Sequence, residues 1–468
     1  MSALGKADFI TLNPATQKPV QKYSYLSWAD AEKIVFVSDR CYRDFTLHSQ
    51  VQTRCEWIAN IGQKLSDRQK EFSERISLEM GKPIPEALAE ITKCASLCQY
   101  FSKNAELWLQ EQKVSDQYKI RRHPYGVVLG IMPWNYPFWQ VFRFAIPALL
   151  SGNTVLLKHA DQVSGCSQLL QELFQSCLPQ KEIFQSLIVT HEVAEKIIQH
   201  PSVRMVSFTG STKAGAKIAS LCGASLKKCI LELGGNDPYV ITESADVLMA
   251  AKACAQGRLL NNGQSCVAAK RFLIHSKVFE SFTKLFQNEF SKLEIGDPLK
   301  GNYDLGPLSE KRFVVDLESH CAELEKRGFK KMFQHPGFEH SGFQDATVGQ
   351  GNFFAPRIYQ GNHSNEFYDE EIFGPIAICY VYDRWDEVLN FITASKYGLG
   401  SAIFSTDQTE IDNFIFSSEA GFVGVNTAVK SAVEVPFGGF KQSGFGRELG
   451  QIGFHEFTQT KTVFTATN

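Results

Sequence analysis

The sequence lacks the features that would place it among nucleic-acid-binding, membrane or secreted proteins. Its 48 basic and 50 acidic residues give a formal net charge of −2 at pH 7, so no excess of positive charge marks a surface for nucleic acid or anionic lipid. No uninterrupted apolar run reaches the ~18 residues that a membrane-spanning helix needs. The first residues have neither the basic nor the apolar part of a signal peptide. We therefore expect a soluble cytoplasmic protein with no nucleic-acid or membrane partner.

Cysteine is too sparse for a disulfide scaffold. The 468 residues include 12 cysteines, and no two of them form a C-x-x-C pair. Cys94 and Cys98 lie one helical turn apart, but no second pair with histidine completes a zinc set. We expect no metal site, and cysteines that stay reduced and pack as small hydrophobic residues. Cys266 is the exception, because it follows a glycine-containing turn.

Three common catalytic signatures are absent as well. The chain has no G-x-x-x-x-G-K-[ST] phosphate loop, no H-E-x-x-H metal motif, and no G-x-G-x-x-G after its early strands. These absences favour a thiol or carboxylate mechanism over a metal-dependent one.

The chain is otherwise that of an ordinary globular protein, with 44% hydrophobic and 21% charged residues. Its length predicts two or three domains, and the first hundred residues show apolar side chains at helical spacing. From Gly126 on, short apolar runs predict strands at Val127–Ile131, Thr154–Leu157, Leu187–Val189, Val203–Phe208 and Cys229–Leu231. The stretches between them predict helices at Trp139–Leu150, Gly165–Cys177, Val193–Gln199 and Thr212–Leu221.

This alternation predicts a parallel sheet with crossover helices. Such sheets bind ligands beyond the carboxyl ends of their strands. Because Lys158, Gly210 and Glu232 each come just after a predicted strand, we expect them to face one crevice. A second α/β region is expected from about residue 234 to 450. The basic segment at 118–124 and the last eighteen residues read as extended, either pairing across a subunit boundary or packing on their own domain.

Three short segments combine residues that suit catalysis. Asn262–Cys266 places a cysteine after a turn, and Leu231–Asn236 places Glu232 at a strand end beside two glycines that let a ligand approach the backbone. Pro133–Pro137 holds one amide, Asn135, in a stiff backbone. Each segment also has an ordinary explanation: a buried cysteine, a solvated glutamate, a turn. Their joint occurrence favours a catalytic site.

With these motifs the chain resembles the NAD(P)-dependent aldehyde dehydrogenase superfamily from Asn13 to its C-terminus. In the order of that family it contains Pro133-Trp-Asn-Tyr-Pro137, Phe208-Thr-Gly-Ser-Thr212, Glu232-Leu-Gly-Gly235, Gly263-Gln-Ser-Cys266, Glu371-Ile-Phe-Gly-Pro375 and Pro436-Phe-Gly-Gly439. The resemblance implies an α/β fold with three parts and a homodimer or homotetramer. These parts are a Rossmann-type cofactor domain (1–112 and 127–233), a second α/β catalytic domain (234–450), and oligomerisation segments (113–126 and 451–468).

The resemblance also implies the catalytic roles. Cys266 would attack the aldehyde as a thiolate and form a thiohemiacetal, while the Asn135 side chain and the backbone N–H of Cys266 hold the oxyanion. Hydride transfer to the nicotinamide would leave a thioester, which water activated by Glu232 would hydrolyse. Family members that pass the acyl group to coenzyme A often lack this glutamate, so a free acid is the expected product.

The cofactor contacts are likewise implied by the resemblance. Gly210 and Ser211 would open a helix whose N-terminus faces the pyrophosphate, and Lys158 would reach the adenosine ribose. Gly215 completes the family spacing G-S-x-x-x-G, or serves close helix packing alone. The expected contacts near the nicotinamide are Trp134, Leu233, Glu371 and Phe373, with an ordinary core position as the alternative for Phe373.

The choice between NAD and NADP depends on charge near the adenosine ribose. Asp161 stands where NAD-using relatives often carry a carboxylate that repels a 2′-phosphate, whereas Lys213 would attract one. We favour NAD, with NADP possible, because a like-charge clash in a pocket discriminates more strongly than a flexible lysine attracts.

Two residues indicate the substrate. The succinate-semialdehyde dehydrogenases of this superfamily, and especially their short bacterial branch, have an arginine at the spacing of Arg143 and a carboxylate-binding serine at that of Ser431. A guanidinium and a hydroxyl suit recognition of a carboxylate, so oxidation of succinate semialdehyde is the expected activity. The alternatives are an arginine on the outer face of an amphipathic helix, a broad aliphatic aldehyde dehydrogenase, a cofactor-free cysteine hydrolase, and an inactive family member.

Overall fold

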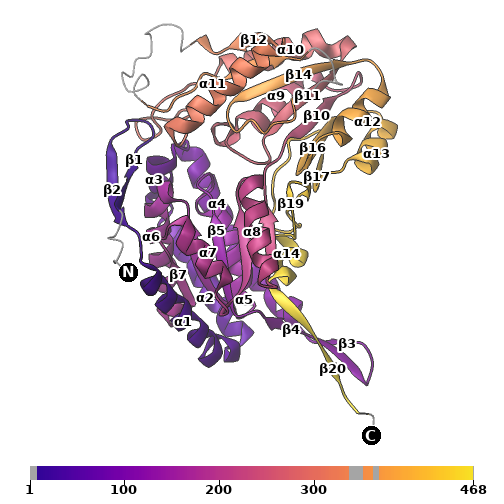
Figure 1. The fold of residues 1–468 in the computed structure, drawn as a ribbon. Coiled ribbons are helices and arrows are strands. Elements are labelled where there is room, and N and C mark those ends of the chain that lie inside the picture. The colour runs from indigo at the N-terminus through magenta and orange to yellow at the C-terminus, as the bar shows by residue number, and fades with distance from the viewer. Residues whose placement is uncertain (1–7, 337–350, 362–367, 467–468) are drawn as a thin grey trace.

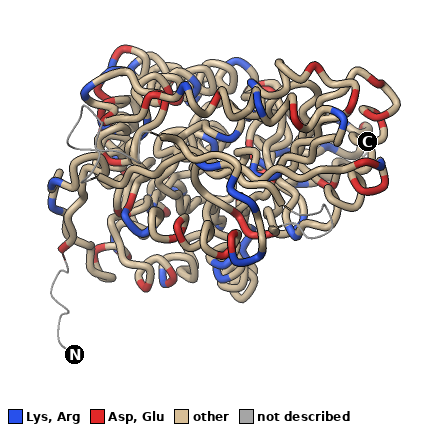
Figure 2. The backbone as a smooth tube through the Cα atoms, turned by 90° about the horizontal axis from the view of Figure 1, so that it is seen from above, with Lys and Arg blue, Asp and Glu red and all other residues tan. Residues whose placement is uncertain are grey.

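A computed structural model describes residues 8–336, 351–361 and 368–466. Two α/β lobes lie side by side, and a three-stranded arm that carries the C-terminal end projects from one of them (Figure 1). Among the described residues, no helix is long and apolar enough to cross a bilayer. Basic and acidic residues are interspersed along the whole backbone (Figure 2), in keeping with the balanced charge of the sequence.

The first lobe is built on a six-stranded sheet in the order β19-β9-β8-β5-β6-β7. The strands are β5 (Val127–Met132), β6 (Thr154–His159), β7 (Phe184–Ser186), β8 (Val203–Thr209), β9 (Lys228–Glu232) and the antiparallel edge strand β19 (Gly444–Phe445). Its helices are α1 (Trp28–Asp44), α2 (Val51–Asp67), α3 (Gln69–Met80), α4 (Ile84–Leu109), α5 (Trp139–Leu150), α6 (Ser164–Gln175), α7 (His191–Gln199) and α8 (Thr212–Ala224). Strands β5 to β9 run parallel, as the alternating pattern predicts.

Every residue of helix α5, from Trp139 to Leu150, is buried, so the helix has no solvent-exposed face. Gly130 on β5 makes room for it, because a Cβ built there would lie 2.0 Å from the ring of Phe144. A helix that is buried on all sides belongs to the core rather than to an amphipathic surface. Arg143 is therefore an interior residue, and its placement on an outer helix face is excluded.

The second lobe contains a seven-stranded sheet in the order β12-β13-β14-β11-β10-β16-β17. All neighbouring strands are parallel except β12 and β13. The strands are β10 (Asp237–Ile241), β11 (Ala269–His275), β12 (Lys330–Gln334), β13 (Arg357–Gln360), β14 (Ile376–Tyr382), β16 (Gly400–Phe404) and β17 (Phe422–Val425). The helices are α9 (Val247–Leu259), α10 (Ser276–Ser291), α11 (Lys311–Lys326), α12 (Trp385–Thr393) and α13 (Gln408–Ser417). A two-stranded ladder, β15 (Tyr397–Gly398) with β18 (Phe440–Lys441), completes this part of the chain.

The arm consists of β3 (Gln112–Lys113), β4 (Tyr118–Pro124) and β20 (Thr458–Phe464), and follows the short helix α14 (Gly450–Glu456). Strand β20 pairs antiparallel with β4 over its full length. The terminal strand thus pairs with the basic segment of its own chain, and both outer edges of the arm remain available.

The first hundred residues differ in one respect from the helical expectation. Residues 8–24 form a hairpin of β1 (Asp8–Leu12) and β2 (Pro19–Ser24). Its turn is held by Asn13, whose side-chain oxygen accepts hydrogen bonds from the backbone N–H groups of Ala15 and Thr16. Asparagine commonly stabilises turns in this way.

Candidate active site

Three connected cavities lie between the carboxyl ends of the first sheet and the second lobe. The inner cavity (about 190 Å³) is lined by Lys93, Gln140, Arg143, Cys266, Lys430 and Ser431, among others. The central cavity has a volume of about 240 Å³, and its lining includes Trp134, Asn135, Leu233, Cys266, Glu371 and Phe373. The outer cavity has a volume of about 810 Å³, and its lining includes Trp134, Lys158, Asp161, Gly210 and Ser211. Cys266 and Gln140 belong to both the inner and central cavities, and Trp134, Gly210 and Ser211 to both the central and outer ones. The three cavities therefore form one channel, with the cysteine where the inner and central cavities meet.

Cys266 follows a turn with an unusual backbone. Asn261, Asn262 and Gly263 all have positive φ angles, of 58°, 58° and 72°, a conformation that asparagine and glycine tolerate best. At Gly263 the second lobe also leaves no space for a side chain, because a Cβ would lie 2.5 Å from the backbone of Gly374. The turn thereby fixes the backbone that carries the nucleophile.

Asn135 is oriented by its neighbours. Its side-chain oxygen accepts a hydrogen bond from Gln140 Nε2 at 3.0 Å, and its Nδ2 donates to the backbone carbonyl of Gln264 at 3.0 Å. Asn261 Nδ2 donates to the Asn135 carbonyl at 2.8 Å. One N–H of the Asn135 amide is therefore in use, and the other can donate into the central cavity beside Cys266.

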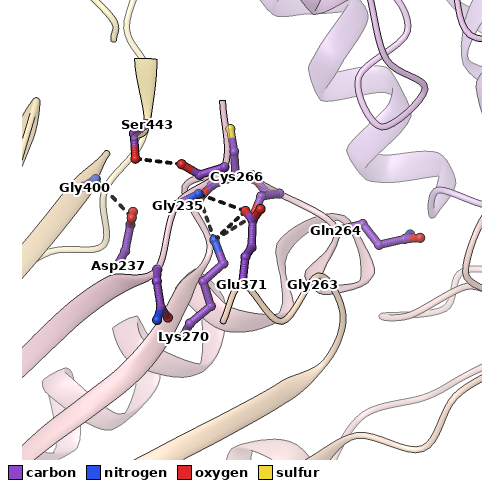
Figure 3. Close-up of polar contacts among 12 residues, drawn as sticks. Gly235, Asp237, Gly263, Gln264, Cys266, Lys270, Glu371, Gly400 and Ser443 are labelled. Carbon is purple, nitrogen blue, oxygen red and sulfur yellow. Dashed lines mark hydrogen bonds and ion pairs between the residues drawn. The ribbon is translucent and has the colours of Figure 1, made fainter. Parts of the chain in front are cut away.

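The buried side chain of Lys270 hydrogen-bonds to the backbone that carries Cys266 (Figure 3). Lys270 Nζ donates to the carbonyl oxygens of Cys266 and Ser265, at 2.6 and 3.2 Å, and lies 3.6 Å from Glu371 Oε1. Glu371 in turn accepts a hydrogen bond from the backbone N–H of Gly235 at 2.9 Å. Glu371 is thus held at the wall of the central cavity by the Gly235 backbone and by Lys270.

The electrostatic environment favours a neutral thiol in this state. Burial raises the pKa of Cys266 to about 12, while the cations Arg143 and Lys270 oppose the rise. At neutral pH the group is therefore a thiol, and it becomes a strong nucleophile only when a cation or a proton acceptor comes close.

The position of Glu232 differs from the expectation of a shared crevice. It ends β9, but it lines none of the three cavities, and neither of its carboxylate oxygens has a hydrogen-bond partner among the described residues. A Cβ at Gly438 would lie 2.9 Å from Glu232 Oε1, so the side chain points toward that loop. Burial, and next the nearby Glu448, raise the pKa of Glu232 well above its ordinary value. In this conformation it is a buried acid held apart from the channel.

Glu448 is a site residue that the sequence did not reveal. Its Oε2 lies 2.7 Å from Arg143 Nε, with side-chain exposures of 0% and 3%, and its Oε1 accepts a hydrogen bond from Ser207 at 3.4 Å. Arg143 also stacks on the ring of Phe437 at 4.5 Å. Arg143 Nη2 has no hydrogen-bond partner among the described residues. The guanidinium thus keeps donor capacity at the inner cavity.

The outer cavity contains the residues expected around an adenosine. Lys158 Nζ lies 3.1 Å from Asp161 Oδ1, and Tyr25 donates from its hydroxyl to Asp161 Oδ2 at 2.6 Å. Ser211 caps helix α8 by accepting a hydrogen bond from the N–H of Ala214, so the positive end of this helix faces the cavity. Tyr25 does not line the cavity itself but orients Asp161, and the sequence did not predict this contact because the two residues are 136 positions apart.

The channel fits a dinucleotide. Thr209 Oγ1, at the boundary of the central and outer cavities, is buried without a hydrogen-bond partner among the described residues. Trp134 and Phe373 meet edge to face at 5.8 Å and form an aromatic wall. Gly215, by contrast, lines none of the three cavities, since a Cβ there would lie 2.4 Å from Leu233 Cδ2. Gly215 therefore allows helix α8 to pack closely on Leu233, which is the second of the two roles expected from the sequence.

Comparison with known proteins agrees with this architecture. Residues 2–463 match the aldehyde dehydrogenase family. The chain is 36% identical over 461 residues to a probable succinate-semialdehyde dehydrogenase [NADP(+)] of Synechocystis, covering 97% of this chain and 99% of that protein. It is 36% identical over 463 residues to the succinate semialdehyde dehydrogenase [NAD(P)+] Sad of Escherichia coli, with 97% of each covered.

Among solved structures, the succinic semialdehyde dehydrogenase of Streptococcus pyogenes in complex with NADP+ is similar, with a TM-score of 0.92. It is 28% identical and covers 98% of this chain and 100% of that chain. The α/β fold class and the oxidoreductase class predicted from the sequence are confirmed. The chain belongs to the aldehyde dehydrogenase family of NAD(P)-dependent oxidoreductases.

Proposed function

We propose that the protein oxidises succinate semialdehyde to succinate with NAD(P). The observation that carries this proposal is the inner cavity, where Arg143 and Ser431 line the same space as Cys266. Arg143 is 3% exposed and keeps an unpartnered Nη2 among the described residues, so a carboxylate at the far end of a short aldehyde would find a buried donor. Relatives named as succinate-semialdehyde dehydrogenases at 36% identity support the same substrate.

The residues of the chain divide the reaction into two steps. The Cys266 thiol gives its proton to water and attacks the aldehyde carbon as a thiolate, and the free N–H of Asn135 together with the Cys266 backbone N–H stabilises the oxyanion. When bound in the central and outer cavities, the nicotinamide cofactor supplies the hydride acceptor. Glu232 then turns from Gly438 toward Cys266, takes a proton from water, and so promotes hydrolysis of the thioester to the free acid.

For the cofactor contacts we propose the residues that line the outer and central cavities, with NAD preferred and NADP also used. Asp161 supports NAD, because Lys158 and Tyr25 hold its carboxylate in place at the outer cavity, where a 2′-phosphate would meet a negative charge. The names of several relatives specify NADP(+), so both cofactors belong in the test.

We further propose a cytoplasmic homodimer or homotetramer that associates through the arm. The outer edge of β20 carries unpaired backbone groups suited to strand pairing, and Phe464 on this strand is 76% exposed. Removal of residues 458–468 should reduce the mass measured by light scattering to that of a smaller assembly. An unchanged mass would contradict the role of the arm.

The decisive experiment compares succinate semialdehyde with butanal, each with NAD and with NADP. We expect a large preference of kcat/KM for the semialdehyde, and a selective loss of ~1.5–3 kcal/mol on it when Arg143→Ala or Ser431→Ala removes a hydrogen bond to a charged group. Equal kcat/KM for the two aldehydes in the unmodified enzyme would refute the substrate and favour a broad aliphatic aldehyde dehydrogenase. Absence of protection by NAD against heat unfolding would favour the cofactor-free hydrolase.

A further inference from the structure

Lys93 is a second cation at the inner cavity, and the sequence did not draw attention to it. It lies on α4, and its Nζ donates to both the carbonyl oxygen and the hydroxyl oxygen of Ser431, each at 2.6 Å. The ammonium also lies 4.5 Å from the ring centre of Trp139. Lys93 therefore joins the helix bundle of the first lobe to the loop that carries Ser431.

The charge of Lys93 has no counter-ion in the described parts of the chain, where no carboxylate lies within 4.0 Å of its Nζ. Glu90, one helical turn away, is already in use: it pairs with Lys82 and accepts the backbone N–H groups of Phe138 and Trp139. Glu448 is paired with Arg143. Glu86, another carboxylate at this cavity, accepts a hydrogen bond from the backbone N–H of Asn261. Because a partly buried charge without a counter-ion is costly, the cavity favours an anion that can pair with Lys93.

The hydrogen bonds determine which way the donors point. An ammonium has three N–H donors and no acceptor, so in the contact between Lys93 and Ser431 the hydroxyl oxygen must accept. The hydroxyl hydrogen of Ser431 is then free to donate elsewhere. One N–H of Lys93 and the Nη2 group of Arg143 are also left over. These three donors match the lone pairs of a single carboxylate.

We propose that Lys93 is a specificity-determining residue, which neutralises the substrate carboxylate jointly with Arg143 and turns the Ser431 hydroxyl toward it. The inference rests on the proposed function and deepens it: the enzyme selects short aldehydes that carry a terminal carboxylate. Lys93 has no part in the chemistry at Cys266, so its removal weakens binding of the charged end and spares the oxidation of uncharged aldehydes.

The test is kcat/KM for succinate semialdehyde divided by kcat/KM for butanal. Lys93→Met should lower this ratio about 10- to 100-fold, the range of a hydrogen bond to a charged group, and Lys93→Arg should retain most of it. Lys103→Met is the matched control, since Lys103 lies on the same helix as Lys93 but is exposed and lines none of the three cavities, and exposed charges contribute little. We expect it to change the ratio less than about twofold. Equal losses on both aldehydes, or an unchanged ratio in Lys93→Met, would show that Lys93 is only structural.

A pH profile of the unmodified enzyme tests the same inference without a variant. Burial, and next Arg143, lower the pKa of Lys93 to about 8; Lys430 acts in the same direction, and Cys94 and Glu90 act against it. The ammonium is therefore present below pH 8 and lost above it, so the ratio should fall between pH 7 and 9.5. Titration of Cys266 and Glu232 affects both aldehydes and cancels in the ratio. Glu86 also lines the inner cavity, and burial raises its pKa to about 7, so the profile is compared with that of Lys93→Met, which keeps Glu86 and should lose the fall between pH 8 and 9.5. A flat profile overturns the role of Lys93, whereas a ratio near one at pH 7 overturns the proposed substrate itself.

Discussion

Gly215 allows a quantitative test of helix packing beside the cofactor cavities. In Gly215→Ala the new Cβ would lie 2.4 and 2.8 Å from the two methyl groups of Leu233, so Leu233 must move by about 1 Å to reach ordinary contact. Overpacking of this kind costs about 1–3 kcal/mol. The matched control is Gly223→Ala on the same helix, because a Cβ there meets nothing within 4 Å. Both changes gain the same helix propensity, of about 1 kcal/mol, which cancels in their comparison.

Thermal unfolding of the cofactor-free protein measures this difference. Gly215→Ala should melt about 1–3 °C below Gly223→Ala, from 1–3 kcal/mol at roughly 1 °C per kcal/mol for a chain of this length. Because Leu233 lines the central cavity, Gly215→Ala should also raise the KM for NAD, and Gly223→Ala should not. Equal melting temperatures would refute the packing argument. Equal melting temperatures with a raised KM in Gly215→Ala alone would indicate direct contact with the cofactor instead.

Three further predictions concern the carboxylates. Glu232→Gln should keep a burst of reduced cofactor and slow steady turnover ~10²–10⁴-fold in stopped-flow traces; an absent burst in a folded protein would place Glu232 in an earlier step. In the unmodified enzyme, hydrolysis should speed up as pH rises through the elevated pKa of Glu232, and Glu448→Gln should move this limb to lower pH by removing a neighbouring carboxylate that raises it; an unmoved pH profile would contradict the coupling. Asp161→Asn should raise the ratio of NADP to NAD activity at least several-fold, and an unchanged ratio would remove Asp161 as the determinant.

The elements of the first lobe could be predicted well where the local pattern decides them. Helix α5 begins and ends at the predicted residues, because its apolar run is bounded by a proline-rich turn and a Ser-Gly-Asn loop. Strand β7 was predicted at Leu187–Val189 but lies at Phe184–Ser186. The strand contains the polar residues Gln185 and Ser186, and its buried residue Phe184 stacks its ring on that of Phe174 at 4.1 Å. Such a tertiary contact leaves no periodic signal.

The residues of the candidate site also divide into those that a local motif predicts and those that depend on contacts between distant segments. The turn before Cys266 and the motif around Asn135 are short and local, so the sequence places them correctly beside one channel. The direction of Glu232, by contrast, is set by Glu448 and the loop at Gly438, more than 200 residues away. The role that we propose for Lys93 depends on its contact with Ser431, 338 residues further along the chain. These residues are ordinary in sequence and become functional candidates through contacts between distant segments.

The pairing of β20 with β4 has a consequence for synthesis. A span of 338 residues separates Arg122 from Thr460, its partner in the ladder, so the arm stays incomplete until β20 has left the ribosome. The remaining β3–β4 hairpin is too small to be stable alone. A chain that terminates before β20 therefore lacks the finished arm, and only copies that contain this strand present the edge through which we propose that subunits join. Subunit assembly would then exclude chains that end before β20.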